Sequence, residues 1–88
     1  MTVTDTEPKL EATFSLLVMS IASNAMMAMG LTVDPQNGKV EIDKNMAKFN
    51  IDLLITLKDK TKNNLNGEEV GLLDQILQDL QMKFVQIN

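Results

Sequence analysis

The sequence predicts an all-α domain: a three-helix bundle in which a helical hairpin packs against a long apolar N-terminal helix, assembled as a homo-oligomer. Three observations predict this fold. Apolar residues recur at steps of three and four in three separate segments. Residues that start and stop helices bound each segment. With 88 residues and no cysteine, the chain is short for building a stable core alone, and oligomerisation is a common remedy.

The composition excludes several kinds of chemistry. The chain has no Cys, His, Trp, Tyr or Arg, and its net charge is −4. Thiol nucleophiles, histidine acid–base catalysis, Cys or His metal sites and arginine clamps on phosphate are therefore absent. The acidic balance and the scarcity of aromatic residues argue against nucleic acid as a partner. We predict a non-catalytic protein without a cofactor.

The first eight residues are polar, and we expect them to form a disordered tail ahead of a single helical domain over 9–88. Acidic residues stand where a secretory signal would have a basic stretch, which argues against such a signal. Pro8 suits the first turn of a helix. The first helix is then predicted from about Lys9 to Met29, with Gly30 as its left-handed C-terminal stop.

This first helix carries apolar seams on two opposite sides. No charged residue occurs between Glu11 and Asp34. The predicted core stripe holds Leu10, Phe14, Leu17, Ile21, Ala25 and Ala28. The second seam holds Ala12, Leu16, Met19, Ser23 and Met26, with Met27 beside it. A helix that is apolar on both sides needs cover on both sides.

The same helix could in principle cross a membrane or bind varied partners. The uncharged stretch is long enough to span a bilayer, but it contains Ser15, Ser20, Ser23 and Asn24, and no cluster of Lys or Arg and no aromatic belt flanks it. We therefore expect that this helix does not span a membrane, and we favour a position between layers of protein. Four methionines lie close together toward the end of this helix: Met19, Met26, Met27 and Met29. Such a cluster is found on surfaces that bind varied partners, and it also suits the core of an oligomer. We favour the oligomer core.

The connector and the second helix follow. Residues 31–42 contain two turn signals, Asp34-Pro35 and Asn37-Gly38, and predict a loop or small hairpin. The second helix is predicted over about 43–62, capped by Asp43. Its predicted core stripe is Ile42, Met46, Phe49, Leu53 and Leu57, with Ile51 and Ile55 forming a smaller strip on the opposite side. Asn50 lies within the core stripe and, if buried, needs a hydrogen-bond partner.

The third helix is predicted over about 67–86. Asn66 and Glu69 have the spacing of a capping box. Asn63 is expected to adopt the left-handed conformation that ends the preceding helix. A continuous apolar seam follows, formed by Val70, Leu73, Leu77, Leu80, Phe84 and Ile87.

Residues 51–85 resemble the core of a bacterial family catalogued as domain of unknown function 1844. The matching residues include Asp52, Lys60-Thr61-Lys62, Asn64-Leu65 and Glu69, together with Ile51, Leu53, Leu54, Leu57, Leu72, Leu73, Leu77, Leu80, Phe84 and Val85. The first helix is also similar, so the resemblance covers about 14–86. The family tends to have Gly where this chain has Asn63, which supports a structural role for that position. The resemblance implies a small cytoplasmic helical domain and no known activity.

From these observations we hypothesise that the protein is a homo-oligomer that acts in protein–protein interaction or scaffolding. A further protein partner, not identified by the sequence, is compatible with this hypothesis. The hypothetical interface consists of Ala12, Leu16, Met19, Ser23, Met26, Met27, Ile51 and Ile55. The alternatives are reversible association with a membrane surface and binding of a small apolar ligand through the Met-rich first helix. For Thr61 we expect a hydrogen bond to a backbone carbonyl, and we rate fold specification above catalysis for Thr61 and Asp52.

Overall fold

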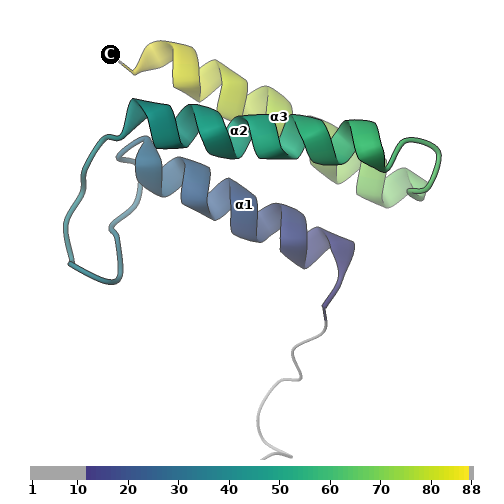
Figure 1. Cartoon of the computed structure of the whole chain (residues 1–88), viewed down its shortest axis with the longest axis horizontal. Coiled ribbons are helices and arrows are strands. Elements are labelled where there is room, and N and C mark those ends of the chain that lie inside the picture. The colour runs from purple at the N-terminus through teal and green to yellow at the C-terminus, as the bar shows by residue number, and fades with distance from the viewer. Residues whose placement is uncertain (1–11, 88) are drawn as a thin grey trace, which may run out of the picture.

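The computed structural model describes residues 12–87, and these form three helices and no β-strand. They are α1 (Phe14–Ala28), α2 (Lys44–Lys60) and α3 (Gly67–Gln86). Figure 1 shows α1 and α2 side by side, with α3 crossing behind α2. The all-α, three-helix prediction is confirmed. The predictions for the tail and for Pro8, Lys9 and Leu10 lie outside the described residues.

Side-chain and backbone caps set both ends of α1. The helix begins at Phe14, later than the sequence predicts, because the Thr13 hydroxyl accepts a hydrogen bond from the Leu16 amide at 3.1 Å and caps it. At the other end Gly30 has φ of +75°. The Gly30 amide donates to the Met27 carbonyl and the Leu31 amide to the Met26 carbonyl, both at 3.0 Å. This is the Schellman arrangement, in which glycine is favoured.

The connector closes at its base without forming strands. Met29 and Ile42 make an isolated antiparallel bridge, and the Asp43 amide donates to the Ala28 carbonyl at 2.7 Å. At the tip, Gly38 has φ of +67°. The predicted choice between a loop and a small hairpin is therefore resolved as a hairpin-like loop, with a single bridge and a turn around Gly38.

The caps predicted for α2 and α3 are present. The Asp43 carboxylate accepts from the Met46 amide at 3.0 Å and starts α2. The helix ends at Lys60, because the Thr61 hydroxyl donates to the Leu57 carbonyl at 2.6 Å and Asn63 takes φ of +71° in the turn that follows. A complete capping box at the start of α3 ties Asn66 and Glu69 together, with reciprocal bonds of 2.9 and 3.0 Å.

The core lies where the three helices meet and combines small residues from α1 with larger ones from α2 and α3. Alanines on α1 and α2 allow close approach of the helix axes, because the interaxial distance depends on the side chains at the contact. The buried apolar residues are Val18, Ala22, Ala25, Ala28, Met29, Ala47, Ile51, Leu54, Leu73, Leu77 and Leu80. Phe14, Ile21, Leu57, Phe84 and Ile87 pack against them.

The predicted α3 seam is largely confirmed, but the predicted core stripe of α2 is wrong. Met46 and Phe49 are 48% and 56% exposed, and only Leu57 of that stripe packs on the core. The buried side of α2 is instead formed by Ala47, Asn50, Ile51 and Leu54. On α1 the predicted stripe is correct at Ala25 and Ala28, which are buried, and at Phe14 and Ile21, which pack against the core, whereas Leu17 is 48% exposed. In α2 the apolar spacing points to the wrong face because Ala47 and Asn50 interrupt the apolar pattern of the buried one.

Asn50 is the one polar side chain buried among the described residues, at 5% exposure. Its Nδ2 donates to the Met46 carbonyl one turn earlier, at 2.9 Å. The predicted requirement for a hydrogen-bond partner is therefore met within α2 itself, which keeps the cost of burying the amide low.

Candidate functional site

The outer face of α1, which we define as Leu16, Leu17, Met19, Ser20 and Ser23, is exposed and uncharged. Leu16 and Met19 are close to half exposed. The Ser20 hydroxyl is turned back onto its own helix, where it donates to the Leu16 carbonyl at 2.8 Å. This face therefore presents mainly apolar side chains, and the Ser20 hydroxyl is already bonded to the helix itself.

The structure separates the residues of the predicted interface. Leu16, Met19 and Ser23 lie on the outer face of α1. Ile51 is only 5% exposed and belongs to the core, so it is buried within the single chain.

The remaining predicted interface residues lie elsewhere. Ala12 precedes the helix and is exposed, and Met26 packs partly against the core. Met27 lines a groove between α1 and α2. Ile55 is exposed on a different side of α2, beside Lys58 and Asp74.

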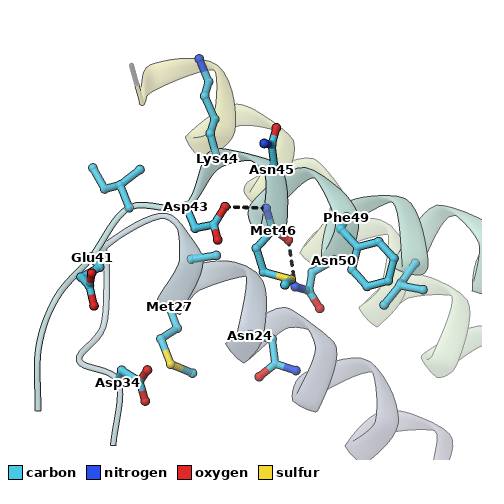
Figure 2. A pocket seen from close by; sticks show the side chains of 13 residues that line it. Asn24, Met27, Asp34, Glu41, Asp43, Lys44, Asn45, Met46, Phe49 and Asn50 are labelled. Carbon is cyan, nitrogen blue, oxygen red and sulfur yellow. Dashed lines mark hydrogen bonds between the residues drawn. The ribbon is translucent and has the colours of Figure 1, made fainter. Parts of the chain in front are cut away.

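An open groove of about 800 Å³ runs between the C-terminal half of α1 and the N-terminal half of α2 (Figure 2). Its apolar lining comes from Met27, Ala28, Ile42, Met46, Phe49 and Leu53. Figure 2 shows that the amides of Asn24 and Asn50 face it from opposite helices. The groove therefore combines an apolar floor with two groups that can donate or accept hydrogen bonds.

One end of the groove is acidic. Asp34, Glu41 and Asp43 line it, and no lysine lies within 4.0 Å of their carboxylates in the part of the chain that the structure describes. Lys44 also lines the groove, but Figure 2 shows its ammonium group pointing away. That group lies 6.0 Å from the centre of the Phe84 ring on α3. The local charge at this end is therefore negative.

The residues that carry the family resemblance have structural roles. Asp52 pairs with Lys48 at 2.8 Å, and the Thr61 hydroxyl bonds the Leu57 carbonyl, as expected. Glu69 completes the capping box, and Leu65 packs against the core. The other family-like positions, Lys60, Lys62 and Asn64, are exposed around the turn between α2 and α3.

Sequence reasoning misses the groove because it assigns Met46, Phe49 and Leu53 to the core. The spacing of these residues correctly marks them as one apolar face. What the spacing does not show is that α1 packs one face further round the helix, against Asn50 and Ala47. Asn24, on the opposite wall, carries no signal of its own.

Within residues 12–87 no group of three or more acidic residues is placed to hold a metal ion. Every buried side-chain nitrogen or oxygen in that range has a hydrogen-bond partner. None of the three helices is both long enough and apolar enough to cross a membrane.

The fold and surface define a small three-helix domain with apolar residues exposed on two adjoining helices. Among family models, the one described as Domain of unknown function (DUF1844) matches residues 11–86. The chain belongs to this family, and the resemblance seen in the sequence is confirmed. No curated protein and no solved structure matches the chain.

Proposed function

We propose that this protein is a non-catalytic interaction protein, and that its first partner is a second copy of itself. The observation that carries the proposal is the outer face of α1. This helix has no charged residue over its whole length, yet Leu16, Leu17 and Met19 are each nearly half exposed. A helix side that faces water normally carries charged or polar residues.

Contact between water and the apolar side chains of that face is unfavourable, and covering the face lowers the free energy. Scattered exposed apolar residues are ordinary, but adjoining ones on an uncharged helix mark surfaces that other molecules cover. Burying apolar area contributes roughly 25 cal/mol per Å². Association driven by this burial also stabilises the folded state of a small domain by mass action.

Binding of a small apolar ligand is a second candidate, because the groove between α1 and α2 has a volume typical of small-molecule sites. Native mass spectrometry of the purified protein tests it. A ligand-bearing species supports the second candidate, and bare protein masses at every concentration argue against it. Docking on a membrane surface is less favoured, since α1 lacks the Lys or Arg that interfacial helices carry.

Self-association is tested by light scattering on a sizing column over a concentration series. We expect a dimer or larger species for the unmodified chain. Met19→Lys places a charge on the outer face of α1 and should weaken the assembly if that face is covered. The matched control is Met82→Lys on α3, where the methionine is similarly exposed. A monomeric mass at all concentrations would contradict the proposal.

A further inference from the structure

The exposed side of α2 carries a pattern that suits a particular partner. Three apolar residues on this side of the helix, Met46, Phe49 and Leu53, are spaced by three and four, and Ile42 stands four residues before Met46, in the connector just ahead of the helix. We call this set the α2 seam: Ile42, Met46, Phe49 and Leu53. Continuing the same heptad spacing reaches Thr56 and then Lys60. Phe49, at the centre, is 56% exposed. The seam is therefore a coiled-coil-like edge that no other helix of the described chain covers.

The two ends of the seam carry opposite charges. The N-terminal end, around Ile42, has the carboxylates of Glu41 and Asp43, which make no ion pair within the described residues. The C-terminal end has the exposed Lys60, which likewise makes none there. A surface that is negative at one end and positive at the other is complementary to a copy of itself turned end to end.

We propose that a second copy of this chain covers the α2 seam, with the two α2 helices antiparallel about a two-fold axis. The proposal rests on the proposed function in that the partner is again a second copy of the chain, but it places the contact on the α2 seam and not on the outer face of α1. A two-fold interface brings the same patch of both copies together. With the second α2 antiparallel to the first, Phe49 of one copy lies opposite Leu53 of the other, Met46 opposite Thr56, and Ile42 opposite Lys60. The two-fold axis makes each of these pairs occur twice.

In this register the apolar side chains of the seam are buried against each other, and the charged groups at its ends lie opposite charges of the other sign. The aromatic and aliphatic side chains of Phe49 and Leu53 meet at the centre, where burial is most complete. Lys60 of one copy reaches the end of the partner seam, where its stem can lie along Ile42 while the ammonium meets Glu41 and Asp43. The net charge of −4 per chain opposes association in general. Local pairing of these opposite charges offsets that repulsion.

Several charged residues near the seam already have partners within the chain. Lys48 forms an ion pair with Asp52 beside the seam, with 2.8 Å between the ammonium nitrogen and the carboxylate oxygen. Lys58 forms an ion pair of 2.7 Å with Asp74 of α3. The groove wall supplied by α1 adds Asn24 and Met27 alongside the seam. The incoming α2 would therefore contact both helices of the first copy.

The first experiment measures the dimer dissociation constant by analytical ultracentrifugation of the full chain. Phe49→Lys should raise it roughly a hundredfold, because two central apolar residues of each dimer become charged. Ile55→Lys is the matched control, since Ile55 is also exposed but on another side of the same helix. It should leave the constant within about threefold of the unmodified value.

A charge-reversal pair then tests the register without touching the apolar residues. Lys60→Glu should raise the dissociation constant about tenfold through two repulsive ends. Adding Glu41→Lys to the same chain should restore most of the affinity, because the two ends attract again. Circular dichroism of each variant checks that it is folded. If Phe49→Lys fails to fold, the reversal pair decides the question by itself.

Cysteine cross-linking tests the antiparallel arrangement directly, since the chain contains no native cysteine. Asp52→Cys lies beside the seam at the level of the two-fold axis, so a short bis-maleimide reagent should link the two copies of it. Lys60→Cys should not be linked, because the two copies of position 60 lie roughly 27 Å apart along the helices. Efficient linking through Lys60→Cys but not Asp52→Cys would overturn the antiparallel register.

The outcomes separate this inference from the proposed function. A dimer that survives Phe49→Lys and Lys60→Glu but dissociates with Met19→Lys would overturn the seam and leave self-association through α1 standing. A monomer at every concentration would overturn both. A dimer that dissociates with Phe49→Lys, tolerates Ile55→Lys and is restored by the reversal pair supports the inference.

Discussion

Asn63 sets the turn between α2 and α3 through its backbone, which has φ of +71°. This conformation is costly for an L-residue because it crowds the Cβ against the carbonyl, and Asn tolerates it better than most. The prediction that this position has a structural role, made from the family resemblance, agrees with the geometry. The residue therefore matters for folding through one dihedral angle.

This role makes a prediction at the residue scale. Asn63→Val should lower the free energy of unfolding by about 1–2 kcal/mol, because a β-branched residue is disfavoured at positive φ. Asn63→Gly should stay within about 0.5 kcal/mol of the unmodified chain. Urea unfolding followed by circular dichroism measures both. Asn64→Val is the control, since Asn64 has no positive φ, and an equal loss there would contradict a role for the dihedral angle.

At the scale of elements, α2 has two apolar sides, and only one of them is covered in the described chain. Leu54 is fully buried in the core, whereas its neighbour Leu53 lines the groove and is 37% exposed. The two leucines are adjacent in sequence and chemically identical. Their difference in burial is therefore a direct measure of which side of the helix faces the core.

The prediction at this scale compares the two leucines. Leu54→Ala should reduce the free energy of unfolding by about 2–5 kcal/mol, the range for buried leucine to alanine. Leu53→Ala should cost less than about 1 kcal/mol, as expected for a substitution away from the core. Both values come from urea unfolding at a protein concentration low enough to keep the chain monomeric. Equal losses would show that the core lies elsewhere.

The same helix shows how far sequence reasoning reaches. Helix number, caps and the α3 seam follow from local rules: Asp43, Asn66 and Glu69 each bond groups within three residues. Local rules do not predict which side of α2 is covered, because that depends on how closely α1 can approach. Ala47 and Asn50 occupy that side, and neither is marked by hydrophobicity. The apolar pattern therefore reveals the candidate surface but places it in the core.

For the whole molecule, self-association couples stability to concentration. A dimer that forms only from folded chains has a Tm that rises with protein concentration, because mass action favours the folded side. We expect this rise in differential scanning calorimetry of the unmodified chain. Phe49→Lys should have a Tm that does not depend on concentration. A constant Tm for the unmodified chain would indicate that no association accompanies folding.

The connector between α1 and α2 has a practical consequence. Its base is fixed by the Met29–Ile42 bridge and the bond from Asp43 to Ala28, while its tip around Gly38 has open space where a Cβ would lie. Exposed loop tips of this kind are the sites that tolerate insertions best. A fluorescent reporter or an affinity epitope inserted between Asn37 and Gly38 would thus leave the three helices undisturbed. Because Asp34 and Glu41 flank this tip and line the groove, the label would also sense when that groove becomes occupied.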